Sequence, residues 1–276
     1  DLQKFVDPFT GTFDGQGYEI RDLFIDRPDK QDGVGLFGAV DVGGVVKNVG
    51  MVDANVTGEL HVGSLVGVNN YTISDCYSTG NVTGEANVGG LVGVNVEGDV
   101  SNSYATVTVT GGVGGSGAGG LVGANLGTVD DSYSTGSVTG DLGVGGLVGY
   151  SFGTVSNSYS TGNVTGFSEV GGLVGSNEGT VDSSYSTGSI TGDDAVGGLV
   201  GDNENTVSNS FWDTATSGQF TSDGGTGKTT AEMQDIATFT GATWDIVAVA
   251  NPSTRNPSYI WNIVDDETYP FLSWQS

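Results

Sequence analysis

Residues 144–149 read Val-Gly-Gly-Leu-Val-Gly, and residues 154–166 read Thr-Val-Ser-Asn-Ser-Tyr-Ser-Thr-Gly-Asn-Val-Thr-Gly. Both blocks recur along most of the chain, and self-similarity at a fixed period indicates a repeat architecture. The last glycines of successive first blocks are 29, 26, 30, 26, 26 and 26 residues apart, and they are Gly38, Gly67, Gly93, Gly123, Gly149, Gly175 and Gly201. A period of about 26 residues therefore organises the chain.

Each repeat divides into three short strand-like segments separated by turns. Valine, threonine and tyrosine favour strands, whereas glycine and asparagine supply the positive φ angles of tight turns. One repeat cannot bury its apolar side alone, so neighbours must stack about 4.8 Å apart around a common core. The sequence therefore predicts an all-β fold, a parallel β-solenoid of about eight rungs, with the right-handed β-helix as the commoner form.

Three columns of equivalent residues would run along such a solenoid. Neighbours on a strand point in opposite directions, so either the leucines or the valines that follow them would be exposed unless a bulge at a glycine turned both inward. The aromatic column leaves open whether it faces the core or the solvent. The predicted leucine column is Leu91, Leu121, Leu147, Leu173 and Leu199, and the aromatic column is Tyr77, Tyr104, Tyr133, Tyr159, Tyr185 and Phe211.

The repeats suggest three regions. Residues 1–34 are predicted to form the first rung and N-terminal cap, and residues 35–210 the stacked repeats. The longest spacing contains Val107–Gly119, which we interpret as a bulge or loop on one rung.

Residues 211–276 are predicted to form a C-terminal cap. Thr229 and Glu232 have capping-box spacing, which favours one short helix over residues 230–237. The tryptophans and tyrosines near the end would then cover the last rung, because an open solenoid edge invites further strand pairing.

The charge of the chain excludes several classes of partner. It carries 33 acidic and 7 basic residues, a net charge of −26, and it has no lysine or arginine between Lys47 and Lys228. Nucleic acid and anionic membranes both require basic contacts, so neither is expected as a partner, and no apolar stretch is long enough for membrane insertion. An excess of aspartate over lysine is typical of salt-loving organisms, since about 1 M salt shortens the Debye length to roughly 3 Å. An ordinary acidic surface protein is the alternative.

Little in the sequence suggests catalysis, and we expect no catalytic residue and no cofactor. His61 and Cys76 are the only histidine and cysteine, which leaves almost nothing for a triad or a histidine metal site. Cys76 stands where other repeats have serine, so we expect it to pack in the interior. Paired carboxylates keep polysaccharide chemistry and Ca²⁺ binding at turns open, although the metal ligands stay unassigned; the pairs are Asp130–Asp131 and Asp193–Asp194.

Two further motifs have simple interpretations. Residues 224–230 read Gly-Gly-Thr-Gly-Lys-Thr-Thr, but Ser222 replaces the first glycine of a phosphate-binding loop and Asp223 would repel a phosphate, so we expect a turn of the cap. Four Asn-x-Ser/Thr sequons are candidate glycosylation sites, at Asn55, Asn70, Asn81 and Asn163.

Gly11-x-Phe13-Asp14-Gly15, followed by the Leu-Val-Gly repeats, resembles the GLUG-motif family of secreted and cell-surface bacterial and archaeal proteins. The resemblance implies a structural repeat with no catalytic residues to transfer. It suggests a non-catalytic extracellular module for structure or adhesion, whose partners are other copies of itself or surface glycans and proteins. The alternatives are a subunit of a self-stacking extracellular filament and a β-helix enzyme that acts on polysaccharide.

Overall fold

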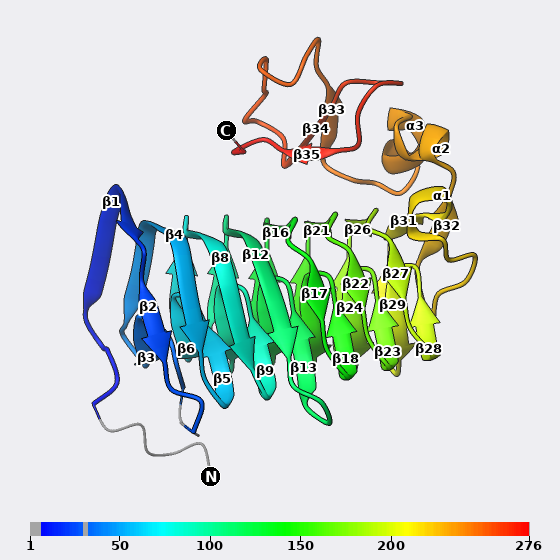
Figure 1. Ribbon diagram of the computed structural model, residues 1–276. Helices are drawn as coiled ribbons and strands as arrows, with labels where there is room; N and C mark the ends of the chain where they lie inside the picture. Colours follow the sequence, from blue (N-terminus) through cyan, green and yellow to red (C-terminus); the bar gives the residue numbers. More distant parts are fainter. Residues whose placement is uncertain (1–6, 30–32, 276) are drawn as a thin grey trace.

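The computed structural model describes residues 7–29 and 33–275, which form an elongated solenoid with the C-terminal segment lying along one side (Figure 1). The predicted parallel β-solenoid is confirmed, with about seven turns where the spacing predicted eight. Strands β1 (Thr12–Arg21) and β2 (Phe24–Asp26) pair in parallel with β4 (Val45–Thr57) and begin an additional rung. Residues 1–6, 30–32 and 276 of the predicted terminal regions lie outside the described residues.

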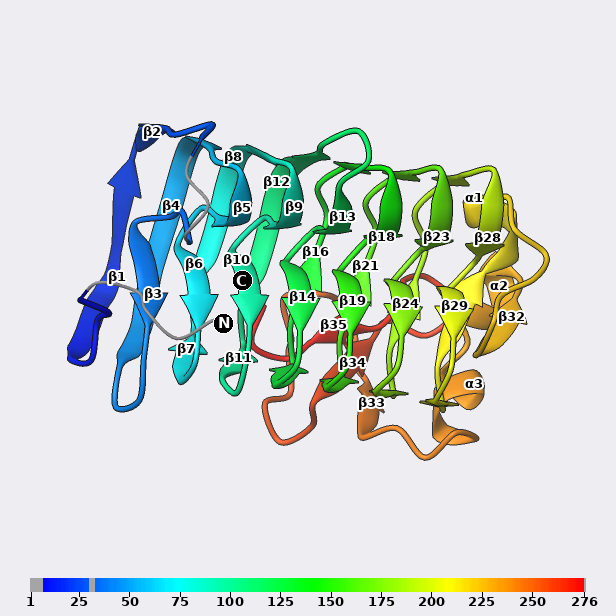
Figure 2. The ribbon, with the colours of Figure 1, turned by 90° about the horizontal axis from the view of Figure 1, so that it is seen from below.

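Two ladders of four-residue parallel strands run side by side along the rod (Figure 2). In the described residues, the first contains β3 (Phe37–Val40), β6 (Val66–Asn69), β10 (Val92–Asn95), β14 (Val122–Asn125), β19 (Val148–Ser151), β24 (Val174–Asn177) and β29 (Val200–Asn203). The second contains β5 (Leu60–Gly63), β9 (Ala86–Gly89), β13 (Ser116–Gly119), β18 (Leu142–Gly145), β23 (Ser168–Gly171) and β28 (Asp194–Gly197).

The third and largest sheet carries the Thr-Val-x and Tyr-Ser segments, together with β1, β2 and β4. Its remaining strands in the described chain are β7 (Thr72–Ser74), β8 (Tyr77–Gly84), β11 (Asp99–Ser101), β12 (Tyr104–Gly111), β15 (Thr128–Asp130), β16 (Tyr133–Ser134), β17 (Val138–Thr139), β20 (Thr154–Ser156), β21 (Tyr159–Ser160), β22 (Val164–Thr165), β25 (Thr180–Asp182), β26 (Tyr185–Ser186), β27 (Ile190–Thr191), β30 (Thr206–Ser208), β31 (Phe211–Asp213) and β32 (Thr226–Lys228).

The core of the solenoid contains both the leucine and the valine columns. Leu147 and Val148 are each 0% exposed, as are their equivalents in the rungs from Leu65 to Val200. The chain bends at Gly146 and Leu147, between β18 and β19, so neighbouring side chains both turn inward. This is the alternative in which a bend at a glycine turns both the leucines and the valines toward the core.

Glycine is required at this bend because the rungs approach one another closely. A Cβ at Gly146 would lie 2.2 Å from the carbonyl oxygen of Gly172, and one at Gly145 would lie 1.9 Å from that of Val148. Both distances are far below a van der Waals contact. The repeated Gly-Gly pair therefore reflects close packing of backbones rather than flexibility.

Two ladders of polar side chains are buried beside the apolar core. Asn69 donates to the Oδ1 of Asn95 at 2.8 Å, and Asn95 donates to that of Asn125 at 2.8 Å. A serine ladder joins neighbouring rungs in the same way; the backbone amide of Ser132, for example, donates to the Oγ of Ser158 at 3.1 Å. Buried polar groups satisfied in this way lock the register of the stack.

The predicted insertion is smaller than its sequence suggests. Residues 107–111 belong to β12 and pair in register with residues 80–84 of β8. The loop is confined to residues 112–115, where Val113 is 97% exposed and Gly114 donates to the carboxylate of Asp141 at 2.6 Å.

The C-terminal end of the solenoid is covered by residues 214–228. This segment contains α1 (Thr214–Ser217), and its strand β32 pairs with β31 in parallel. Asp223 donates through its amide to Val200 at 3.1 Å, while the buried Trp212 packs against the core. The Gly-Gly-Thr-Gly-Lys-Thr-Thr stretch belongs to this closing turn and strand.

Residues 229–275 then fold back along the side of the rod, over β16, β21 and β26 (Figure 1). We call this part the return segment. In place of one helix over residues 230–237 it has two, α2 (Thr230–Met233), which begins with the predicted capping box, and α3 (Ile236–Thr240). It continues in a small sheet of β33 (Ile246–Ala248), β34 (Trp261–Ile263) and β35 (Phe271–Leu272).

Asp213 anchors the return segment to the last rung. Its buried carboxylate accepts hydrogen bonds from the hydroxyls of Tyr269 and Thr230, both at 2.7 Å, and from the amides of Ala215 and Thr216. Burial acts to raise the pKa of Asp213, but these four donors outweigh it and hold the pKa below its usual value.

Candidate functional site

The predicted aromatic column faces outward and forms a continuous ladder. Neighbouring rings from Tyr77 to Tyr185 stack with centroids 4.8–5.0 Å apart and planes within 4° of parallel. The ring of Tyr77 lies against Gly50, where an added Cβ would be 2.2 Å from the ring. The ladder therefore offers ring edges and hydroxyls to its surroundings, because the ring faces cover one another.

Two residues before each ring the chain turns a corner in the left-handed conformation. Asp and Asn tolerate this conformation better than most residues, and they occupy five of these six positions. Their φ angles lie between 45° and 53°, at Asp75, Asn102, Asp131, Asn157, Ser183 and Asn209. We call this row the corner column; it lies directly beside the tyrosine ladder.

The return segment covers only part of the ladder. Tyr159, Tyr185 and Phe211 are buried, with 6%, 2% and 7% of their surface exposed, while Tyr77 and Tyr104 remain partly exposed. The sequence predicted that the aromatic residues near the C-terminus would cover the last rung. Instead, Trp261 packs beside Tyr159 and Tyr185, so these residues cover the side of the rod.

Two indoles fasten the return segment to the corner column. Trp244 donates to the carbonyl oxygen of Asn209 at 2.7 Å, and Trp274 donates to that of Asp131 at 3.1 Å. Left-handed corner residues present these carbonyls to the side, where an indole N–H can reach them. The path of the return segment is therefore set by two long-range hydrogen bonds.

Beyond Trp274 the edge of the return segment leaves two hollows. The larger has a volume of about 360 Å³, and we call it the indole hollow. It is lined by Asn102, Asp131, Asp245, Pro257, Ser258, Tyr259, Ile260, Ser273 and Trp274. The smaller hollow, about 200 Å³, is lined by Asp75, Cys76, Tyr77, Asn102, Tyr104, Tyr133 and Trp274.

Asp131 is the residue with the most unusual environment in the indole hollow. Its Oδ1 atom is buried and accepts no hydrogen bond from the described residues. Burial, together with the neighbouring charge of Asp130, raises the pKa of Asp131 to about 6. The residues around Asp131 therefore leave its carboxylate incompletely hydrogen-bonded.

The other carboxylates named from sequence are not brought together with it. Asp130 accepts hydrogen bonds from the Oγ of Ser156 at 2.6 Å and from the side-chain Nδ2 of Asn157 at 3.0 Å. Its carboxylate is therefore bonded to the neighbouring rung. Asp193 and Asp194 are exposed at the start of β28, on the side of the rod opposite the return segment (Figure 1). Within residues 7–29 and 33–275 no group of three His, Cys, Asp or Glu residues is arranged to hold a metal ion.

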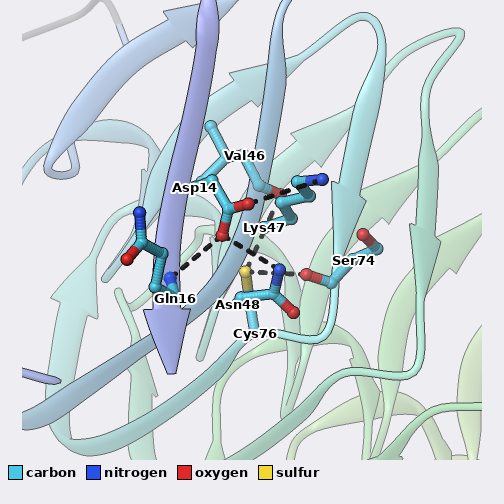
Figure 3. A network of polar contacts seen from close by, with 7 residues as sticks. All are labelled: Asp14, Gln16, Val46, Lys47, Asn48, Ser74 and Cys76. Carbon is cyan, nitrogen blue, oxygen red and sulfur yellow. Dashed lines mark hydrogen bonds and ion pairs between the residues drawn. The ribbon is translucent and has the colours of Figure 1, made fainter. Parts of the chain in front are cut away.

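Cys76 is buried in the serine ladder, and its backbone amide donates to the Oγ of Ser103 at 3.2 Å. Its thiol lies 3.1 Å from the carbonyl oxygen of Ser74 and 3.7 Å from that of Val46, close to the contacts of Asp14 with Lys47 and Asn48 (Figure 3). Burial raises the pKa of the thiol to about 12, so it stays protonated and unreactive.

The remaining candidates lie apart from the hollows. His61 adopts a φ of 54° within β5, and its Nδ1 lies 3.2 Å from the side-chain nitrogen of Asn87. The sequon residues Asn55, Asn81 and Asn163 are exposed, while Asn70 is half-buried. Asn55 and Asn81 are paired in register on neighbouring rungs.

Sequence reasoning missed Trp274, Asn102 and Asp75 as members of one site. A signal was present for the last two, since an Asp, Asn or Ser recurs two residues before each aromatic residue. No local pattern marked Trp274, because its partner Asp131 is 143 residues away.

The fold and the site define a repeat protein of the parallel β-solenoid class. The GLUG motif model matches residues 58–83, 84–110, 114–139, 140–165 and 168–191. The chain thus carries five repeats of the GLUG motif, as the resemblance predicted.

Two comparisons extend this result. The chain is 46% identical to Halomucin of Haloquadratum walsbyi over 72 residues, which is 26% of this chain and 1% of Halomucin. Its fold is similar to that of a Bacteroides ovatus protein proposed to be an immunoglobulin A1 protease, with a TM-score of 0.59 and 20% identity over 96% of this chain and 77% of the other. At that identity the likeness shows the fold alone.

Proposed function

We propose that the chain is a non-catalytic extracellular module of a cell-surface or secreted protein, serving as a rigid spacer that also adheres to a partner. The observation that carries the proposal is the uninterrupted stack of identical rungs, whose leucine and valine columns are fully buried from Leu65 to Leu199. Such a stack holds its ends at a fixed distance, because each rung is locked to the next by hydrogen bonds and by packing.

The comparisons support a surface location. Halomucin is a surface protein of a halophilic archaeon, and this chain shares its repeat while spanning only 1% of its length. A net charge of −26 suits a protein that functions in high salt, where self-repulsion is screened. Among the described residues, no helix is long and apolar enough to cross a membrane.

The covered C-terminal end argues against the filament alternative. Residues 214–228 occupy the edge on which another copy would have to stack, so end-to-end pairing would require them to move. For the enzyme alternative, the carboxylate pairs Asp130–Asp131 and Asp193–Asp194 do not converge on one groove, which disfavours acid–base chemistry by paired carboxylates.

Negative-stain electron microscopy in high salt, with and without Ca²⁺, tests the structural part of the proposal. We expect short, uniform rods of single-chain size in both conditions. Long filaments with a constant axial repeat would replace the spacer by the filament. Release of reducing ends from a panel of polysaccharides, lost in Asp131→Asn, would replace it by the enzyme.

A further inference from the structure

We propose that the indole hollow binds a cationic group, the guanidinium or ammonium of a basic side chain on a partner polypeptide. The inference rests on the adhesive part of the proposed function and names the chemistry of its ligand. The hollow lies between the corner column and the return segment, so both parts of the molecule contribute to it.

The charged side chains that line the hollow are two carboxylates, those of Asp131 and Asp245. Asp131 lines the hollow, and one of its carboxylate oxygens is buried without a donor from the described residues. Asp245 is exposed and uses one of its oxygens to accept the backbone amide of Ile260 at 3.1 Å. A ligand must therefore bring N–H or O–H donors, and positive charge would be neutralised by the two carboxylates.

The described part of the chain places no cation of its own in the hollow. Lys47 and Lys228 lie 3.5 Å from Asp14 and Glu232, at other parts of the molecule. Arg255 lies over the ring of Phe271, 5.5 Å from its centroid, and its charge acts on the phenols of Tyr133 and Tyr159, but it lines neither hollow. The negative potential of the hollow is thus left for a ligand, and an anionic ligand would be repelled.

A cation is also favoured over a neutral sugar. A sugar ring packs on the face of an aromatic ring, but the faces of the tyrosine ladder cover one another and its first face is covered by Gly50. The indole of Trp274 is open to either ligand, but the carboxylates of Asp131 and Asp245 in the same hollow favour a cation. The second hollow, on the other side of Trp274 with Asp75 in its wall, would take a neighbouring basic side chain of the same segment.

Binding of a cation should depend on pH. It requires ionised Asp131, so affinity should rise as the pH passes through about 6 and reach a plateau above it. The titratable groups that face the two hollows or adjoin Asp131 are Asp75, Asp130, Asp131 and Asp245, together with the thiol of Cys76 and the phenols Tyr77, Tyr104, Tyr133 and Tyr259. Burial raises the pKa values of Cys76, Tyr77, Tyr104 and Tyr133 further above this range, so these four groups stay neutral over it.

Tryptophan fluorescence offers a direct test. Trp212, Trp244 and Trp261 are at most 5% exposed, whereas Trp274 is partly exposed, so a ligand in the hollow should change mainly the signal of Trp274. The probes are N-acetyl-arginine amide and its uncharged isostere N-acetyl-citrulline amide, titrated at pH 8. We expect saturation by the arginine probe with a Kd of about 1 mM, and at least about tenfold weaker binding of the citrulline probe. The response should disappear in Trp274→Phe.

Matched variants test the role of the carboxylate. Asp131→Asn keeps a residue type that other corners use at the same φ, and it should weaken arginine binding about tenfold and abolish the dependence on pH. Asp193→Asn changes the net charge equally on the opposite side of the rod and should bind as the unmodified chain does.

Three outcomes would overturn the inference: equal binding of arginine and citrulline, an equal loss in Asp193→Asn, or quenching by a neutral oligosaccharide but not by arginine. The last would assign the hollow to glycans. None of them would change the rods expected by electron microscopy, so the two proposals fail separately.

Discussion

The two halves of the tyrosine ladder have similar sequences and the same stacking, yet different surroundings. Tyr159 and Tyr185 are buried, whereas Tyr77 and Tyr104, in register with them, are partly exposed. The difference arises because Trp261 packs beside Tyr159 and Tyr185, whereas the partly exposed Trp274 lies beside Tyr104 and Tyr133. Tyrosines of similar repeats thus have different roles. Those in one half are part of the packed interior, and those in the other half are available for contact.

The largest expected effect compares one ring from each half. Tyr185→Ala should lower the free energy of unfolding by about 3–5 kcal/mol, since it leaves a cavity and removes the hydrogen bond of the phenol to the carbonyl of Pro270 at 2.6 Å. Tyr104→Ala should cost about 1 kcal/mol, because its ring is partly in water already. Denaturant titrations of both variants measure the two costs. Equal values would show that stacking along the ladder, rather than coverage, determines stability.

Removing the anchor of the return segment should have the next largest effect. Asp213→Asn keeps the volume and one oxygen for the two amides, but it replaces the oxygen that accepts from the hydroxyls of Tyr269 and Thr230 by an NH₂ group, so we expect a loss of about 2–3 kcal/mol. Limited proteolysis should cut first within residues 229–275 and leave the rungs intact. Asp193→Asn, which is exposed, serves as the control; uniform cleavage of the solenoid in Asp213→Asn would contradict a separate anchoring role.

The charge of Asp131 should make stability depend on pH in the opposite sense from a paired carboxylate. Its pKa of about 6 lies above the ordinary 3.8, so the folded state binds this proton more tightly than the unfolded state does. Protonation of Asp131 therefore adds to the free energy of unfolding in full below about pH 3.8, and this addition is lost as the pH rises through about 6. Because the residue is partly exposed, we expect only about 1 kcal/mol. Unfolding at pH 5 and pH 8 should differ by less in Asp131→Asn than in the unmodified chain; an unchanged difference would refute the assignment.

The smallest effect should come from the end of the return segment. Trp274→Phe keeps an aromatic ring but loses the hydrogen bond to Asp131, at a cost of about 1 kcal/mol. Hydrogen exchange should accelerate at residues 273–275 while the amides of β21 and β26 stay protected. Faster exchange along the whole ladder would mean that this contact organises more than the edge of the covered half.

The repeating part of the molecule was predictable from sequence at the level of single residues. Leu147 and Val148 recur at a fixed spacing, and residues of one column must lie over one another in a stack. The pattern could not decide which columns face inward, because the answer depends on a bend at Gly146 that brings two neighbours into the core.

Periodicity is a local signal repeated many times, and it was sufficient to predict the solenoid, its strand segments and the place of Cys76 among the serines. The course of the return segment has no period to reveal it. It depends on Asp213, Trp244 and Trp274, whose partners lie on rungs far away in the chain. Which tyrosines are covered, and where a hollow with an unpartnered carboxylate remains, is therefore decided only when the folded chain brings these distant groups together.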